Sequence, residues 1–342
     1  MEVEAFTKSD LLFLKKLINK NLLEEDFYNS VKQGGISEQQ LSAILCNLRR
    51  EKGFRAFKGV IGSEPTICCS DEYIKQNAYT DEIYTVESNL KVIFSADAHM
   101  GHILDCIQGK RNHMEMMLEF ADEQSIRHVV FLGDLIEGVD YSAFHKSVYE
   151  QCLKIRPDRE AQIEYVDKYL PKMNKTTFHF LAGNHDSFSY NNITYDFAKD
   201  LMEKCGRDDI KIVGFDKTDL KINNDRIKLI HNYKSFSSKP TDPYFQFSGG
   251  SHITKVKKYK NMYLRQVVPP LCRIQKKDKC IIGDKEVPFF SGFLVVTFSF
   301  SPYKKIVGER VDYYRFDNDY NKPVCFYTEE RGVTRKLRKM RD

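Results

Sequence analysis

The feature that most constrains the fold is a pattern that recurs five times between residues 90 and 252: an apolar run followed by Asp, His or Asn. The segments between the first three runs, 111–125 and 157–173, carry apolar residues at helical spacing and have the length of crossover connections. In sheets with helices on their faces, ligands bind beyond the carboxyl ends of the strands. We therefore expect an α/β fold in which the polar residues converge at one edge of a sheet.

These polar residues are of the types that hold metal ions. Mixed carboxylate, imidazole and amide ligands suit Mn²⁺, Fe, Ni²⁺ or Zn²⁺ and do not select among them. Each short motif is a weak signal by itself, whereas the ordered set, with every member at a strand end, is specific. The candidates are Asp97, His99, Asp134, Asn184, His185, His231 and His252.

Three segments carry a resemblance to a known family: VIFSADAHMGH (92–102), VVFLGDLIEG (129–138) and FLAGNHDS (180–187). They resemble motifs of the calcineurin-like metallophosphoesterase superfamily, and the resemblance covers about residues 90 to 300. The pattern is also similar to phage and prophage phosphoesterases with an N-terminal winged helix, and more distantly to double-strand-break repair nucleases. The resemblance implies a four-layer α-β-β-α sandwich over residues 90–330.

The resemblance also implies a two-metal hydrolase, in which a metal-bridging hydroxide is the nucleophile and His185 assists the leaving group. Two divalent cations about 3.5–4 Å apart lower the pKa of a water and clamp the phosphoryl oxygens. Mn²⁺ is the first expectation, with Fe, Ni²⁺ or Zn²⁺ as alternatives. Asp134 takes the position that bridges the two metals. The remaining implied ligands are Asp97, His99 and His252 for the first metal, and Asn184 and His231 for the second.

One ligand of the family pattern is missing. The family's last motif is Gly-His-x-His, and this chain has Gly249-Gly250-Ser251-His252. Because Gly250 replaces a histidine that normally binds the second metal, we expect the second site to be the weaker one. His102 could take the missing place, could contact a substrate phosphate, or could be a loop residue.

Residues 1–69 form a separate unit in the sequence pattern. A helix that begins at Ser37 is followed by two short strand-like runs, the plan of a winged helix. A small helical cap or dimerisation module is the alternative. The predicted buried face of the helix after Ser37 is Leu41, Ile44, Leu45 and Leu48. In the winged-helix interpretation, the side chains expected to face phosphates are Arg49, Arg50, Lys52, Arg55 and Lys58.

The charge is concentrated at the C-terminus. Residues 331–342 contain six basic residues and one acidic residue, which accounts for the whole net charge of +5. This tail is either solvated or an electrostatic contact for a polyanion. The polar residues 70–89 read as a linker, so we expect four parts: a module (1–69), a linker (70–89), a phosphoesterase domain (90–330) and a basic tail (331–342).

Several classes of protein are excluded by what the sequence lacks. The N-terminus has no signal-peptide pattern, and no apolar run approaches the ~20 residues that span a bilayer. Nine cysteines without a C-x-x-C pair indicate reduced thiols. We expect a soluble cytoplasmic protein that does not bind membranes; no protein partner is indicated.

The function expected from the sequence is a phosphodiesterase or nuclease that acts on DNA or another nucleic acid. The preference for diesters depends on the N-terminal module and on the resemblance. One alternative is a phosphatase or phosphodiesterase for small nucleotides. The other is a non-catalytic nucleic-acid-binding protein whose second metal site has decayed.

Overall fold

The structure is a computed structural model of the 342-residue chain. The residues that it describes are 6–52, 56–61, 64–69, 81–103, 105, 107–108, 111–138, 154–156, 158–190, 193–231, 245–252, 254–259, 263–273, 279–282, 285–316 and 322–332.

The N-terminal residues form three helices and a hairpin with a core of their own. The elements are α1 (Lys8–Ile18), β1 (Leu22–Leu23), α2 (Glu24–Gln33), α3 (Glu38–Lys52), β2 (Ala56–Ile61) and β3 (Glu64–Cys69). Ser37 caps α3 in a reciprocal pair: the Gln40 N–H donates to Ser37 Oγ (3.2 Å) and the Ser37 N–H donates to Gln40 Oε1 (3.0 Å). The predicted start of this helix is therefore confirmed, as is its buried face of Leu41, Ile44, Leu45 and Leu48.

The winged-helix assignment stays a prediction. Three helices followed by an antiparallel hairpin match the expected order of elements. The side chains that would face phosphates lie outside the part of the chain that the structure describes, as do residues 70–80 of the linker and 333–342 of the tail.

The last residues of the predicted linker, 81–88, lie on the domain that follows. Strand β4 (Glu82–Ile83) pairs in parallel with β13 (Lys217–Ile222). Ile83 is buried, and the Thr85 N–H donates to Asn223 Oδ1 at 2.9 Å. This segment is thus held by the sheet and does not connect two units freely.

One large mixed sheet forms the centre of the second domain. From one edge to the other its strands follow the order β19-β18-β16-β17-β15-β14-β13-β12-β9-β8-β5-β20-β21-β22. Strands β5, β8, β9 and β12 are parallel neighbours, as expected for strands joined by helical crossovers. The bounds of the strands not given above are β5 (Asn89–Ser95), β8 (His128–Leu132), β9 (Thr177–Ala182), β12 (Ile210–Phe215), β14 (Asp225–Ile230), β15 (Phe245–Ser248), β16 (Lys255–Tyr259), β17 (Tyr263–Val267), β18 (Lys279–Ile282), β19 (Lys285–Pro288), β20 (Gly292–Phe300), β21 (Ile306–Phe316) and β22 (Pro323–Gly332). A separate two-stranded ribbon pairs β6 (Ile107–Gln108) with β7 (Arg111–Asn112).

The sheet folds back so that its two halves face each other. Phe94 of β5 stacks on Phe247 of β15, with ring centroids 4.0 Å apart, although five strands separate β5 and β15 in the sheet order. Both rings belong to a buried core that lies between the two halves. Because successive side chains of a strand point to opposite faces, Ile93 points away from this core and into another.

That other core lies between one face of strands β12, β9, β8, β5 and β20 and three helices. They are α5 (His113–Glu123), α7 (Arg159–Tyr169) and α8 (Phe197–Cys205), and all three contribute buried side chains to it. The α/β class and the two crossover helices are confirmed, whereas the second helical layer of the four-layer sandwich stays a prediction. No helix within the described ranges is long and apolar enough to cross a membrane.

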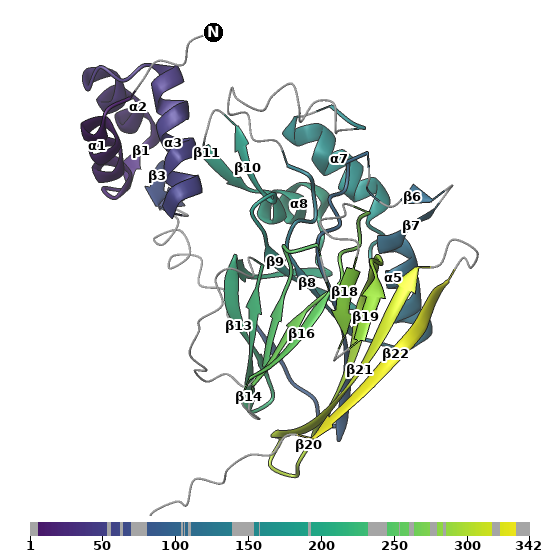
Figure 1. The fold of residues 1–342 in the computed structure, drawn as a ribbon. Helices are drawn as coiled ribbons and strands as arrows, with labels where there is room; N and C mark the ends of the chain where they lie inside the picture. The colour runs from purple at the N-terminus through teal and green to yellow at the C-terminus, as the bar shows by residue number, and fades with distance from the viewer. Residues whose placement is uncertain are drawn as a thin grey trace, which may run out of the picture.

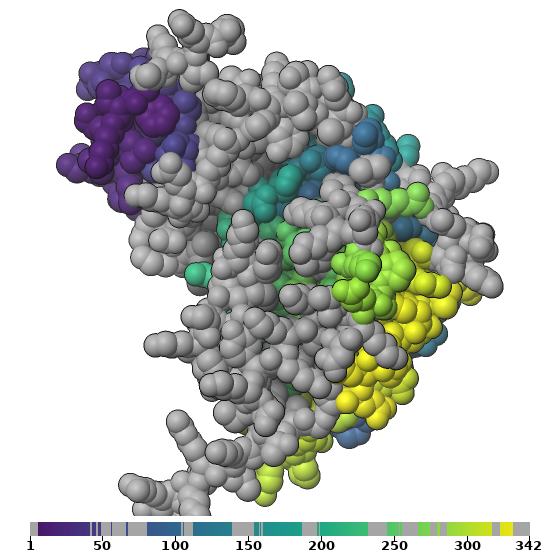
Figure 2. Space-filling model, viewed as in Figure 1, coloured from purple at the N-terminus to yellow at the C-terminus, as the bar shows by residue number. Residues whose placement is uncertain are grey.

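The N-terminal hairpin and the second domain share a smaller sheet with the order β1-β3-β2-β11-β10. Strands β10 (Ser187–Tyr190) and β11 (Ile193–Asp196) form an antiparallel hairpin, and β11 pairs in parallel with β2 through Thr194 and Phe57. Figure 1 shows the N-terminal helices (purple) beside β10 and β11, and Figure 2 shows the same unit as a lobe at one corner of the molecule. The N-terminal module is therefore attached to the segment that directly follows Asp186.

Candidate metal centre

All seven sequence-predicted site residues lie together at the carboxyl ends of five strands. Asp97 and His99 follow β5, Asp134 follows β8, and Asn184 and His185 follow β9. His231 follows β14, and His252 comes four residues after β15. Asn184 and His185 are partly exposed, and the other five are buried. The predicted convergence of these side chains is what the structure contains.

The backbone is strained where it presents these residues. Four of them have φ angles in the left-handed region: Asp97 (53°), His99 (46°), Asp134 (56°) and His252 (50°). Residues other than glycine enter this region at a cost of about 1–2 kcal/mol each. Hydrogen bonds between loops hold two of them there: the Asp97 N–H donates to the Gly133 carbonyl (2.9 Å) and the His99 N–H to the Asp134 carbonyl (3.0 Å). Strain of this kind clusters at functional sites.

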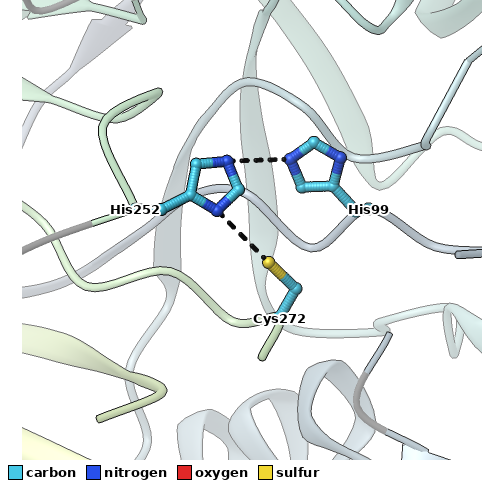
Figure 3. Close-up of side chains that lie close together, drawn as sticks. All are labelled: His99, His252 and Cys272. Carbon is cyan, nitrogen blue, oxygen red and sulfur yellow. Dashed lines mark hydrogen bonds between the residues drawn. The ribbon is translucent and has the colours of Figure 1, made fainter. Parts of the chain in front are cut away.

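A first group of ligand atoms gathers around His99. Its Nδ1–H donates to Glu137 Oε2 at 2.7 Å, so the neutral ring carries its lone pair on Nε2. That Nε2 faces His252 Nε2 at 3.2 Å (Figure 3) and Asp134 Oδ2 at 3.8 Å. Nitrogen and oxygen ligands bound to one ion at about 2.0–2.2 Å lie roughly 3–4 Å from each other. The distances between these three ligand atoms therefore suit one cation bound by all three side chains.

Asp97 completes this group. One ligand atom from each of Asp97, His99 and Asp134 lies within 4.8 Å of the other two. Both oxygens of Asp97 also accept the Gly250 N–H at 3.0 Å. Burial, together with the nearby Asp134 carboxylate, raises the pKa of Asp97 to about 6. A cation is the partner that two buried carboxylates at this distance require.

A second group forms around His231 on the other side of Asp134. The His231 Nδ1–H donates to the Leu132 carbonyl at 2.7 Å, which directs Nε2 toward Asp134 Oδ2 (3.0 Å) and Asn184 Oδ1 (3.1 Å). Burial opposes protonation of His231, but the Asp134 carboxylate outweighs it and raises the pKa of this ring to about 10. A proton thus occupies the place where a metal would bind, and metal binding would release it.

The two groups meet at a single atom. Asp134 Oδ2 faces His99 Nε2 on one side and His231 Nε2 on the other, at 3.8 and 3.0 Å. The nearby histidines hold the pKa of Asp134 well below its usual range, although burial acts in the opposite direction. The residues present therefore fit two cations that share one carboxylate.

His185 lies beside both groups and at the mouth of the site. Its N–H donates to Asp134 Oδ1 at 2.9 Å, its Nδ1–H donates to the Glu137 carbonyl, and its ring stands edge-on to His99 with centroids 4.8 Å apart. The side chain is 24% exposed, compared with 3% for His99 and 1% for His231. Burial lowers the pKa of His185. This ring is placed to meet a bound substrate.

Gly250 contributes its backbone to the site. Its φ angle is 69°, and a Cβ atom at this position would overlap the His231 carbonyl oxygen and lie 3.1 Å from His231 Nε2. The space next to the second group is thus filled by the chain itself, which also donates to Asp97 as described above. Whether the second metal binds more weakly stays a prediction.

His102 was considered as a replacement ligand. It is buried, its N–H donates to the His99 carbonyl at 3.0 Å, and burial lowers its pKa. None of the groups of mutually close ligand atoms found among the described residues contains His102. Its role as a replacement ligand stays a prediction.

Sequence reasoning finds Asp186 at a strand end but gives it no role; in the structure it shapes the site without facing it. Its fully buried carboxylate accepts four backbone N–H groups, from Gly183 and Asp134 at 2.7 Å, from Leu135 at 2.7 Å and from Ile136 at 3.2 Å. These bonds tie the loop after β9 to the loop after β8. The signal was present, because Asp186 closes the GNHD segment.

Two further residues were missed. Glu137 holds His99, and its position three residues after Asp134 was the available signal. Cys272 lies 3.6 Å from His252 Nδ1, measured to its Sγ atom, and nothing in the sequence around it indicated this contact.

No family model and no curated protein matches the chain. Solved structures with some similarity include Vps29 from Chaetomium thermophilum, with 11% identity and a TM-score of 0.36 over 72% of this chain and 100% of that one. The Pseudomonas putida nuclease MPE has 13% identity and a TM-score of 0.28 over 60% of this chain and 83% of that one. A 5′-nucleotidase from Candida albicans has 11% identity and a TM-score of 0.32 over 70% of this chain and 54% of that one. At these TM-scores the similarities establish neither a family nor a function for this chain.

Proposed function

We propose that this protein is a two-metal phosphoesterase of the calcineurin-like superfamily that hydrolyses phosphodiesters in DNA or another nucleic acid. The observation that carries the proposal is the position of Asp134 Oδ2 between His99 Nε2 and His231 Nε2. A carboxylate that faces two separate groups of nitrogen and oxygen ligands is what a pair of divalent cations needs at its centre.

The proposed ligands divide between the two groups described above. Asp97, His99 and His252 hold the first cation, Asn184 and His231 the second, and Asp134 both. When bound, the cations supply a water with a lowered pKa and neutralise charge on the phosphoryl oxygens. Mn²⁺ is our first candidate, since the donor set does not distinguish it from Fe, Ni²⁺ or Zn²⁺.

His185 is the proposed acid for the leaving group. The hydrogen bond from its Nδ1 to the Glu137 carbonyl fixes the ring, so that Nε2 is the nitrogen directed to substrate. The acid is the doubly protonated ring; burial lowers its pKa, so this form releases its Nε2 proton readily. Delivery of that proton to the departing oxygen contributes about 10²–10⁴-fold to the rate. The backbone bond from His185 to Asp134 keeps this ring at a constant distance from the shared carboxylate.

The nucleic-acid part of the proposal is supported by the shared sheet. Strand β11 belongs to the hairpin that begins one residue after Asp186, and it pairs with β2 of the N-terminal module. A polymer that contacts this module would therefore be held near the His185 loop. The basic residues 331–342 would add contacts with phosphates.

The test is hydrolysis of bis-p-nitrophenyl phosphate and p-nitrophenyl phosphate by chelator-treated protein supplied with Mn²⁺, Fe²⁺, Ni²⁺ or Zn²⁺. We expect the diester to be cleaved with Mn²⁺ and no cleavage in excess chelator. Faster cleavage of the monoester would favour the small-nucleotide alternative. Inactivity with every metal would leave the non-catalytic alternative.

Duplex DNA, single-stranded DNA and RNA are then compared as substrates at several salt concentrations. Removing residues 333–342 should weaken binding to the preferred polymer and flatten its salt dependence, since each lost phosphate contact removes about 0.9 from the log–log slope on duplex DNA. An unchanged slope would show that the tail is only solvated. Equal rates on short nucleotides and on polymers would contradict the proposed substrate class.

A further inference from the structure

Cys272 touches two of the strand ends that carry the proposed ligands of the first cation. The segment before it runs beside the end of β5, where Pro270 pairs with Ala96. The Cys272 N–H donates to the Asp97 carbonyl at 3.0 Å, and its Sγ lies 3.6 Å from His252 Nδ1 (Figure 3). The side chain is completely buried. Its position is therefore fixed relative to both Asp97 and His252.

The two nitrogens of His252 have different partners. Nδ1 contacts the Cys272 sulfur, and Nε2 faces His99 Nε2 at 3.2 Å. His99 donates its Nδ1–H to Glu137 Oε2. Burial lowers the pKa of His99, but the Glu137 carboxylate outweighs it and raises this pKa. When the His99 ring is neutral, its Nε2 accepts from the His252 Nε2–H, and His252 Nδ1 accepts from the Cys272 thiol.

A cation held by His252 Nε2 requires the opposite tautomer, because the lone pair must then be on Nε2. The ring stays neutral if one proton leaves Nε2 for water and one from water attaches to Nδ1. Nδ1–H then donates to the Cys272 sulfur, and the thiol keeps its own proton. The contact between ring and sulfur is kept in both tautomers only if the partner can both donate and accept. A thiol or a hydroxyl can do this, whereas an aliphatic side chain cannot.

We propose that Cys272 is the positioning residue of His252, acting as hydrogen-bond donor in the metal-free protein and as acceptor in the metal-loaded one. The inference rests on the proposed function in that it takes His252 as a metal ligand. The ring then keeps its orientation through loading, and the site needs no rearrangement of this side chain.

The same three residues could instead form a site in which the sulfur itself is a ligand, since one ligand atom from each of His99, His252 and Cys272 lies within 4.8 Å of the others. The geometry favours the positioning role. The sulfur contacts Nδ1, whereas the nitrogen that faces His99 is Nε2. Direct ligation is one outcome of the test below.

The first measurement needs no activity. Protein labelled with ¹⁵N-histidine is compared by NMR as wild type, Cys272→Ser and Cys272→Val, each without metal and with Zn²⁺, at a pH above the raised pKa of His99. In wild type and Cys272→Ser we expect His252 to carry its proton on Nε2 without metal and on Nδ1 with metal. In metal-loaded Cys272→Val the Nδ1–H has lost its sulfur acceptor, so we expect its signal to split or broaden as the ring takes more than one orientation. A single sharp Nδ1–H signal in this variant, as in wild type, would overturn the inference.

The second measurement is isothermal titration with Mn²⁺ on the same three proteins. Removing a partner that orients a ligand typically costs 10–100-fold in metal affinity, so we expect a loss of about that size for Cys272→Val. Cys272→Ser should stay within about threefold of wild type. Cys205→Val removes a partly buried thiol on α8 and serves as the control, with no expected change. Equal losses in the Ser and Val variants would show that Cys272 only fills space, which contradicts the proposal.

Cobalt distinguishes positioning from direct ligation. A sulfur-to-cobalt charge-transfer band in Co²⁺-loaded wild type that disappears in Cys272→Ser would make the sulfur a ligand and overturn the positioning role. If the protein cleaves no phosphoester but the tautomer results hold, the proposed activity fails while the role of Cys272 stands. If the protein cleaves phosphoesters but His252 shows no change of tautomer, the proposed activity stands and the role of Cys272 fails.

Discussion

The backbone N–H of His185 donates to Oδ1 of Asp134 at 2.9 Å, which leaves Oδ2 of the same carboxylate directed at His231 and His99. One carboxylate thus carries two separate tasks on its two oxygens. Oδ1 fixes the loop that bears the proposed acid, and Oδ2 joins the two groups of ligands. Substitutions at these two residues should therefore fail in different ways.

Asp134→Asn should lose both metals and essentially all activity. The amide keeps the size of the side chain but removes the negative charge that both cations share, so we expect the rate to fall by more than about 10²-fold. Rates and Mn²⁺ titrations measure this. Asp219→Asn, on the exposed face of β13, is the matched control and should behave as wild type. Retention of two tight metals in Asp134→Asn would disprove the shared-carboxylate arrangement.

His185→Asn should keep its metals and lose rate. The backbone bond to Asp134 survives the substitution, because it uses the main chain, while the proton donor is removed. We expect a rate about 10²-fold lower with unchanged Mn²⁺ stoichiometry. His128→Asn replaces a partly exposed histidine on β8, remote from the site, and serves as the control. A loss of metal comparable to that of Asp134→Asn would remove His185 from its proposed role.

Gly250→Ala should destabilise the protein and weaken Mn²⁺ binding. The left-handed backbone costs an alanine about 1–2 kcal/mol, and its Cβ would also overlap the His231 carbonyl. Gly35→Ala is the control, since Gly35 has a φ of 74° with no atom within 4 Å of the added Cβ. Chemical denaturation should show a larger loss of unfolding free energy at position 250, and metal affinity should fall only there.

The same geometry concerns a histidine at position 250. Gly250→His would create the Gly-His-x-His motif of the calcineurin-like superfamily, but the backbone directs its Cβ into the His231 carbonyl. We therefore expect no gain in Mn²⁺ affinity. A variant that folds as well as wild type and binds the second metal more tightly would contradict this expectation.

Stability should fall in mild acid partly through His113. This ring stacks on Phe316 with centroids 4.0 Å apart and its Nδ1–H donates to the Leu271 carbonyl at 2.9 Å. Burial lowers the pKa of His113 from its usual 6.5 to about 4. The neutral form is thus the native one, and its contribution is complete above pH 6.5 and is lost as the pH falls toward 4. By about pH 5 the loss is about 2 kcal/mol, because one pKa unit corresponds to about 1.4 kcal/mol.

His113→Phe keeps an aromatic ring and removes the titration. Urea unfolding at pH 8 and pH 5 should show a free energy of unfolding that falls less in the variant than in wild type. The lost hydrogen bond to Leu271 costs about 1 kcal/mol at both pH values and does not change the comparison. Parallel pH dependence in the two proteins would show that His113 is not responsible.

Local signals in the sequence were sufficient for the five strands that carry the candidate residues and for the convergence of these residues. Buried parallel strands are nearly continuous apolar runs, and the first polar residues after them have to lie at the edge of the sheet. Asp97 and Asp134 were identified in this way, and the structure places them together. The role of Ser37 as a helix cap was also predicted from local sequence, because a capping side chain stands directly before an apolar helical face.

Contacts between distant parts of the chain could not be predicted in this way. The pairing of Phe57 with Thr194 joins two short strands, and their residue types do not indicate which strand pairs with which. The contact of Cys272 with His252 depends on a segment that lies beside β5 only after the sheet has folded back. The attachment of residues 81–83 to β13 was missed for the same reason, since a short polar stretch resembles a linker until its neighbour is known.

The pairing of β2 with β11 determines where this protein can be cut for expression. A chain begun at Asp81 would lack β2, and the edge of β11 would then lose its pairing at Thr194. Such an open edge invites pairing with another copy, which leads to aggregation or strand exchange. Since β10, the partner of β11, starts one residue after Asp186, the disturbance would begin next to the GNHD loop. The N-terminal helices and hairpin are therefore better kept in any shortened version of this protein.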